Sequence, residues 1–294
     1  MYPQVIQQLI DEEHLPDSYG KDASRWFLPL VDELRDSIEQ SGKAPLFLGI
    51  NGAQGTGKST LGKLIKLCLE SNGYSIVVLS IDDFYLGKAA RIELAARQHP
   101  LLATRGVPGT HNTNRLGDVM RRLREGELKE PLVLPAFNKA SDDSVGEADC
   151  PRLTQQANLV ILEGWFVGAG AQAEAALVEP INELEAQEDQ NGDWRRYVNK
   201  RLAEDYVPIF DMLDRLILLQ APSFEMVYEW RGLQEDKLRN LGGGDSAGVM
   251  NSAQLQRFIQ HYERLTRHCL ATLPAQADTV FTLDENHRVT GRRG

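Results

Sequence analysis

Apolar residues along the chain follow two spacings, which together predict strands that alternate with helices. Short continuous apolar runs, some rich in β-branched residues, are typical of buried strands. They cover 46–50, 75–80, 158–162, 216–219 and 279–283. Apolar positions at helical spacing predict helices over 3–14, 22–40, 60–70, 87–98, 114–125, 171–189, 193–213, 223–240 and 252–271, whereas 135–153 is polar and irregular. This order predicts an α/β fold with a parallel sheet and helices on both of its faces.

Length and composition narrow the class of protein. Of the 294 residues 42% are hydrophobic, enough for a sizeable core, and we expect one domain over 1–294 with an N-terminal helical extension at 1–42. The formal net charge of −10 disfavours nucleic acid and anionic membranes as partners. The three cysteines are isolated from one another, and no apolar run approaches about 20 residues. We therefore expect a cytoplasmic protein without disulfides or structural zinc; the oligomeric state stays open.

A glycine-rich segment joins the first predicted strand to the following helix and reads G-x-x-x-x-G-K-S. Its glycines let backbone N–H groups surround a phosphate chain, Lys58 can reach the β- and γ-phosphates, and the Ser59 hydroxyl can ligate Mg²⁺. The alternative is a glycine-rich turn that matches by chance, but the strand before it and the helix after it favour the phosphate loop. The predicted nucleotide site comprises Gly52, Ala53, Gln54, Gly55, Thr56, Gly57, Lys58, Ser59 and Thr60.

Two adjacent carboxylates, Asp82 and Asp83, follow the second predicted strand. Ligands bind beyond the carboxyl ends of the strands in an open parallel sheet, so this pair should lie near the end of the triphosphate. A carboxylate there can accept the proton of a substrate hydroxyl or hold Mg²⁺ through water. The alternative is that the pair only caps a helix. We take Asp82 as the base, although the pattern does not decide between the two.

Glu163 closes the apolar strand 158–162 and stands at the position of the acid that completes the Mg²⁺ shell with the phosphate-loop hydroxyl. Glutamate departs from the commoner aspartate, and a solvated strand-end turn is the alternative. The expected metal ligands are therefore Ser59 and Glu163.

Three further polar residues lie in loops between the second strand and the Glu163 strand, and they can hold an anionic acceptor: Arg105, His111 and Lys139. An arginine fits a carboxylate through two parallel hydrogen bonds. Each residue also has a plainer interpretation. Arg105 can hold a turn, His111 can be a neutral structural hydrogen bonder, and Lys139 can be a solvated loop cation.

These motifs resemble the P-loop small-molecule kinases related to uridine kinase, phosphoribulokinase and pantothenate kinase, and within them the D-glycerate 3-kinases of plants and fungi. The resemblance runs from about residue 45 to 285. It is carried by the phosphate loop, Ile81-Asp82-Asp83-Phe84-Tyr85-Leu86, Arg105-Gly106-x-Pro108-Gly109-Thr110-His111, Phe137-Asn138-Lys139, Glu163-Gly164-Trp165-Phe166 and Tyr228-x-Trp230-Arg231-x-x-Gln234-Glu235. Asn112 stands where these kinases have an aspartate, so no acidic role is transferred to it.

The resemblance implies a three-layer P-loop kinase fold with a helical lid at 223–250, in which Gly242-Gly243-Gly244 is a plausible hinge. It implies ATP and Mg²⁺ as cofactors and D-glycerate as the acceptor. It also implies that Arg231 covers the transferring phosphate, and it places Asp83 and Tyr85 beside Arg105, His111 and Lys139 in the acceptor site. Lys237 and Arg239 on the same helix could equally be solvated.

Two other classes of function stay open at this point. One keeps the kinase chemistry and changes the acceptor to another small hydroxy acid or a nucleoside. The other is a nucleotide-dependent switch or an ATP-binding scaffold without turnover. A GTP switch reads guanine through Asn-Lys-x-Asp, and both 138–141 and 199–202 lack the aspartate. This argues against a GTP switch but not against an inactive ATP-binding protein.

Overall fold

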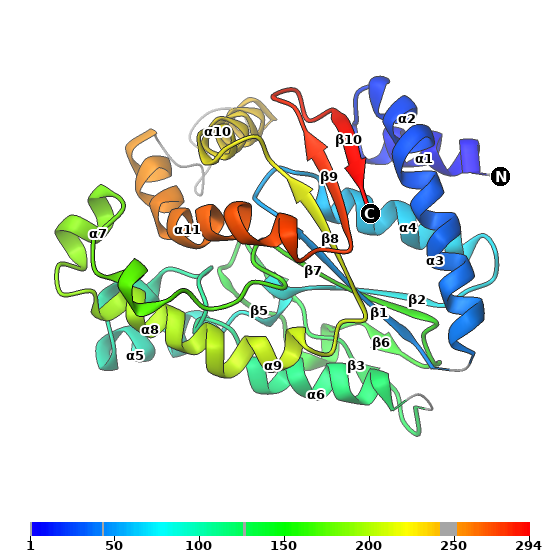
Figure 1. Cartoon of the computed structure of the whole chain (residues 1–294). Coiled ribbons are helices and arrows are strands. Elements are labelled where there is room, and N and C mark those ends of the chain that lie inside the picture. Colours follow the sequence, from blue (N-terminus) through cyan, green and yellow to red (C-terminus); the bar gives the residue numbers. More distant parts are fainter. Residues whose placement is uncertain (1, 43, 126–127, 242–251) are drawn as a thin grey trace.

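A computed structural model describes residues 2–42, 44–125, 128–241 and 252–294 of the chain (Figure 1). Its centre is a six-stranded sheet in the order β10-β9-β8-β1-β7-β2. The strands are β1 (Leu46–Gly52), β2 (Ile76–Ser80), β7 (Leu159–Gly164), β8 (Arg215–Gln220), β9 (Thr279–Leu283) and β10 (Val289–Arg293). Neighbouring strands are parallel except for β10, which pairs antiparallel with β9. The mostly parallel sheet confirms the predicted fold class.

Helices cover both faces of this sheet because alternate strand residues point to opposite sides. Leu48 and Ile50 of β1 face one hydrophobic cluster, and Phe47 faces the other. The first cluster is covered by α1 (Tyr2–Glu13), α2 (Ser18–Asp22), α3 (Leu28–Ser41), α4 (Lys58–Glu70) and α10 (Phe224–Leu241). The second is covered by α6 (Thr113–Arg124), α9 (Val207–Phe210) and α11 (Ser252–Thr272). Figure 1 shows α1 to α4 on one side of the sheet and α6 and α9 on the other.

Two short β-hairpin-like pairs and three more helices lie outside the main sheet. Strands β3 (Leu132–Val133) and β6 (Arg152–Leu153) pair, as do β4 (Phe137–Asn138) and β5 (Asp143–Ser144). All but β3 lie within 135–153, the segment expected to be irregular. The helices are α5 (Lys88–Arg97), α7 (Glu183–Glu188) and α8 (Asp193–Arg201). No described helix is long and apolar enough to cross a membrane.

The expected helix over 171–189 is wrong for most of its length. The structure has a short 3₁₀ turn at Glu174–Leu177 and then α7 at Glu183–Glu188. Pro180 disfavours helical backbone in the residue before it. The carbonyls of residues 176–179 accept hydrogen bonds from two buried arginines instead of from helix N–H groups. Tertiary hydrogen bonds therefore replace the helix that the spacing predicts.

The strand register brings the polar strand ends together at one edge of the sheet. Ser80 at the end of β2 is paired with Glu163 on β7, and Asn51 on β1 is paired with Gly164. The phosphate loop follows β1 and Asp82 follows β2. Because both strands pair with β7, the phosphate loop and Asp82 lie close to Glu163 in space.

Candidate active site

The phosphate loop adopts a backbone that its glycines make possible. Gly55 and Gly57 have φ angles of +84° and +89°, in the left-handed region that favours glycine. A Cβ on Gly52 would lie 2.5 Å from Thr56 Oγ1, so this position also excludes a side chain. The loop leads into the N-terminus of α4, where unpaired N–H groups and the helix dipole favour a phosphate.

Lys58 lies across this loop, with its Nζ donating to the carbonyl of Ala53 at 3.0 Å. Thr56 Oγ1 donates to the same carbonyl at 2.8 Å. Burial lowers the pKa of Lys58, and the attraction of Glu163 and Asp82 opposes this shift. The ammonium therefore lies within electrostatic reach of both acids, at the place where a triphosphate would end.

Ser59 and Glu163 meet as the sequence predicts. The Ser59 hydroxyl donates to Glu163 Oε1 at 2.9 Å, and Glu163 is buried within the sheet edge. A hydroxyl and a carboxylate oxygen are ligands that suit Mg²⁺, which usually takes one or two protein ligands and completes its shell with phosphates and water. Across the described parts of the chain, no group of three or more His, Cys, Asp or Glu could hold a metal by itself. The pair fits a magnesium ion brought in with a nucleotide.

Asp82 lies in a 3₁₀ turn at Ile81–Phe84 and is held by two partners. Lys139 Nζ is 2.7 Å from its Oδ2, and the Tyr85 hydroxyl donates to its Oδ1 at 2.8 Å. Burial alone would raise the pKa of Asp82, but the Lys139 charge and the two hydrogen bonds outweigh it and lower the pKa. The carboxylate is therefore ionised at neutral pH, as a general base requires.

Asp83 differs from its neighbour. Burial raises its pKa, although its carboxylate accepts backbone hydrogen bonds from Phe137, at a long 3.4 Å, and from Ser80. Ser80 is the residue before the turn, so Asp83 fills the capping role that the sequence leaves open. The geometry thus favours Asp82 over Asp83 as the base.

His111 is buried beside Asp82 and is neutral, because burial lowers its pKa to about 3. Its ring stacks on Tyr85 at 4.4 Å between centroids, and its Nδ1 is 2.7 Å from the Tyr206 hydroxyl. That hydroxyl also accepts from the backbone N–H of Gly109, and which of the His111 ring and the hydroxyl donates in their contact depends on the tautomer of the ring. Nε2 of His111 is buried and has no hydrogen-bond partner among the described residues.

Arg105 contacts a residue that the motifs do not indicate. Its Nη1 pairs with Asp142 Oδ1, and its guanidinium lies 5.6 Å from the centre of the Phe137 ring. The Tyr262 hydroxyl donates to the Arg105 backbone carbonyl at 3.1 Å. The structure thus places Arg105 against Asp142 and the Phe137 ring, and its expected role toward an acceptor stays a prediction.

Arg231 lies on α10, with its guanidinium 6.0 Å from the ring of Phe258 on α11. Its charge acts on the buried Tyr262 hydroxyl, so it lies on the same side of the molecule as Arg105. The proposed hinge, Gly242-Gly243-Gly244, lies outside the described residues, as do the side chains of Lys237 and Arg239. The lid and the role of Arg231 therefore stay predictions.

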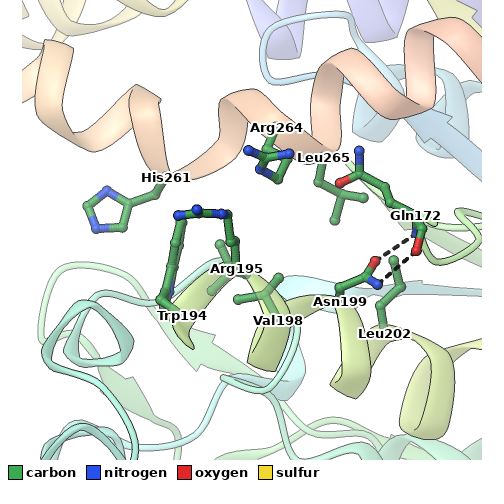
Figure 2. Close-up of a pocket in the computed structure, with 10 residues that line it drawn as sticks. Gln172, Trp194, Arg195, Val198, Asn199, Leu202, His261, Arg264 and Leu265 are labelled. Atoms are coloured by element: carbon green, nitrogen blue, oxygen red, sulfur yellow. Dashed lines mark hydrogen bonds between the residues drawn. The ribbon is translucent and has the colours of Figure 1, made fainter. Parts of the chain in front are cut away.

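A separate cavity of about 20 Å³ lies beneath α11, away from the phosphate loop (Figure 2). Asn199 and Gln172 close one end through two hydrogen bonds of 2.7 and 3.0 Å. The cavity has room for about one water molecule, so it cannot take a nucleotide or an acceptor. The candidate site is instead the open edge of the sheet between the phosphate loop and the loops that carry Asp82, Arg105 and Lys139.

A phosphate loop, a hydroxyl–carboxylate pair and an ionised acid at the end of a parallel sheet define a P-loop kinase. The uncharacterized kinase mug58 of Schizosaccharomyces pombe is 32% identical over 251 residues, which cover 79% of this chain and 85% of that protein. The chloroplastic D-glycerate 3-kinase of Arabidopsis thaliana is 25% identical over 254 residues, or 82% of this chain and 52% of that protein. No family model matches the chain.

A solved structure, the D-glycerate 3-kinase of Cryptococcus neoformans, has the same fold. Its TM-score is 0.76 at 22% identity, and the match covers 92% of this chain and 99% of that one. This chain belongs to the family of P-loop small-molecule kinases that includes mug58 and the chloroplastic D-glycerate 3-kinase. It is an ATP-dependent kinase of a small molecule.

Proposed function

We propose that this kinase phosphorylates D-glycerate to 3-phosphoglycerate. The observation that carries the chemistry is the ionised Asp82, held by Lys139 and Tyr85 beside the phosphate loop. The choice of glycerate rests on the resemblance through the segment Arg105 to His111 and on the activity for which the chloroplastic relative is named.

In the proposed reaction the acceptor hydroxyl oxygen attacks the γ-phosphorus of ATP. The bond from that phosphorus to the bridging oxygen breaks, ADP leaves, and the hydroxyl proton passes to Asp82. Lys58 and the amides of the phosphate loop hold the β- and γ-phosphates, and Arg231 offsets charge on the transferring group. Ser59 and Glu163 would hold Mg²⁺, which neutralises phosphate charge when it is bound with the nucleotide.

A panel of acceptors tests the proposal through ADP release. The panel contains D-glycerate, L-glycerate, other small hydroxy acids, glycerol and nucleosides, and product identity is checked by mass spectrometry and NMR. We expect the highest kcat/KM with D-glycerate and phosphate on its 3-hydroxyl. The Lys58→Ala variant is the control for contaminating kinases. A nucleoside or a different acid as the best acceptor would overturn the choice of glycerate, and no ADP release above the control would favour a scaffold.

A further inference from the structure

Arg91 on α5 is an arginine that no motif indicates, yet it is completely buried. Its guanidinium joins three segments of the chain. Nη1 donates to the Leu86 carbonyl at 2.5 Å, Nε donates to the Ala103 carbonyl at 3.3 Å, and Nη2 donates to Asp142 Oδ2 at 2.5 Å. These segments are the ones that carry Asp82 and Tyr85, Arg105 and His111, and Lys139. One buried charge thus connects every loop of the predicted acceptor site.

Among the described residues, Asp142 is the only one whose carboxylate forms an ion pair with Arg91, and it also forms an ion pair with Arg105. Its Oδ2 accepts a hydrogen bond from Nη2 of Arg91, and its Oδ1 accepts one from Nη1 of Arg105. The residue has a φ of +55°, which is uncommon for a residue with a side chain. This backbone bends the β4–β5 hairpin so that the carboxylate reaches both guanidinium groups, and Lys139 of the same hairpin reaches Asp82.

The two arginines differ in what they leave available. Arg91 is buried, so its charge would lack a counterion if the Asp142 carboxylate moved away. This cost in free energy holds Asp142 in place. The Arg105 side chain is 26% exposed, and among its described contacts only Nη1 has a hydrogen-bond partner. The other guanidinium nitrogens of Arg105 thus have capacity for a further partner, and a carboxylate could bind them through parallel hydrogen bonds.

We propose that Arg91 and Asp142 are positioning residues that aim Arg105 at the carboxylate of the acceptor. This inference rests on the proposed function, because it requires an acid as the acceptor. Asp142 acts through Arg105 and not on the reacting atoms. Its removal should therefore weaken binding of the acid and leave phosphoryl transfer within the bound complex nearly intact.

The test compares Asp142→Asn with Asp143→Asn, a matched control on the same hairpin. Asp143 accepts from the Lys88 backbone N–H, and it acts on Arg91 through its charge but forms no described hydrogen bond with either arginine. We expect Asp142→Asn to raise the KM for D-glycerate by about tenfold or more, with kcat and the KM for ATP changed less than about threefold. Asp143→Asn should leave all three constants within about twofold.

A double-mutant cycle with Arg105→Ala shows whether Asp142 acts through Arg105. Adding Asp142→Asn to Arg105→Ala should produce no further rise in KM, because the group to be positioned is already gone. Asp142→Glu, which keeps a charge for Arg91, should recover part of the affinity and supplies the test if Asp142→Asn does not fold. Thermal melting of each variant separates misfolding from loss of the site.

Additive effects in the cycle, equal effects of the two hairpin variants, or a fall in kcat with an unchanged KM would each overturn the inference. The wild-type acceptor panel is measured first. If the wild type phosphorylates no acid, the proposed function fails and this inference fails with it. If the wild type phosphorylates D-glycerate and the cycle is additive, only the positioning role fails.

Discussion

Two buried arginine clusters in this protein use the same chemistry in different ways. Next to the loops of the proposed acceptor site, Asp142 joins Arg91 to the partly exposed Arg105. Beneath α11, Arg195 pairs with Asp189 and Arg264 pairs with Glu185, and both arginines are nearly inaccessible. Both clusters connect distant loops through guanidinium groups.

The difference lies in how many of the donors are satisfied. Arg195 donates to carbonyls of residues 177, 178 and 189 and to the Asp189 carboxylate. Arg264 donates to carbonyls of residues 176 and 179 and to both oxygens of Glu185. Every nitrogen of these two guanidinium groups is therefore engaged, and the cluster beneath α11 is closed. An arginine whose three guanidinium nitrogens all have partners serves the fold, whereas Arg105, with one described nitrogen engaged, has capacity for a ligand.

This comparison predicts which substitutions reduce turnover and which reduce stability. The largest effect on turnover is expected from Lys58→Ala. We expect the ammonium to bind the phosphates rather than to support the core, so phosphoryl transfer should be abolished while the melting temperature changes little. Steady-state kinetics and thermal melting measure the two effects. Turnover within tenfold of the wild type would contradict the assignment of the phosphate loop.

Asp82→Asn should lower kcat by roughly two orders of magnitude or more, with a modest change in ATP affinity. The substitution keeps the shape of the side chain and removes the base. Asp83→Asn is the matched control and should have a much smaller effect. If Asp83→Asn is the inactive variant, the choice within the pair is wrong, and a loss confined to ATP affinity would point to a metal role for Asp82.

Arg231→Ala should cut kcat by roughly a hundredfold, with the acceptor KM little changed, because an interaction made mainly in the transition state lowers kcat and kcat/KM together. Arg231→Lys should recover only part, since a compact ammonium cannot reproduce the planar fork. A normal kcat with a raised acceptor KM would place Arg231 in the acceptor pocket beside Arg105.

The closed cluster should show the opposite behaviour. Glu185→Gln leaves the buried Arg264 without its counterion and should destabilise the fold by about 3 to 5 kcal/mol, while kcat of the folded fraction stays near the wild type. Denaturant unfolding and active-site-normalised kinetics measure both quantities. A stable variant with impaired turnover would mean that the cluster beneath α11 contributes to the site.

The smallest expected effect is a loss of folding stability as the pH falls. His261 adjoins the closed cluster, and burial lowers its pKa to about 4 from an ordinary value near 6.5. The unfolded chain takes up the proton first, so stability is full above pH 6.5 and falls as the pH drops toward 4. This histidine should reduce the free energy of unfolding by about 1 kcal/mol at pH 5.5.

The acid prediction has an internal comparison. His261→Gln should flatten the dependence of unfolding on pH between 7 and 5.5, whereas His14→Asn, at an exposed position, should not. His111 at the active site is also held neutral by burial, with a pKa of about 3, and should add a similar acid-dependent loss. An unchanged slope in His261→Gln would mean that this histidine is protonated as readily in the folded state as in the unfolded state.

The sequence by itself determined the features that depend on neighbouring residues. The phosphate loop lies within eight consecutive residues, Gly52 to Ser59, and its glycines report the backbone directly. Apolar runs located the buried strands, and the topology of a parallel sheet brought Asp82 and Glu163 to the edge that carries Lys58. The polar strand β10 was not predicted because its residues lack an apolar run, and its pairing with β9 makes it a strand.

Tertiary structure decided what depends on residues far apart in the chain. The sequence around Arg91 has the pattern of an exposed helix. It does not indicate that the Arg91 guanidinium joins Leu86, Ala103 and Asp142. Nor does spacing show that Pro180 and two distant arginines replace a helix with a loop. A local sequence pattern indicates the preferred backbone conformation and which face of an element is buried. The pairing of buried charges depends instead on which loops the fold brings together. For this protein, the phosphate loop follows from local sequence, whereas the loops that carry Asp82, Arg105 and Lys139 are joined by long-range contacts.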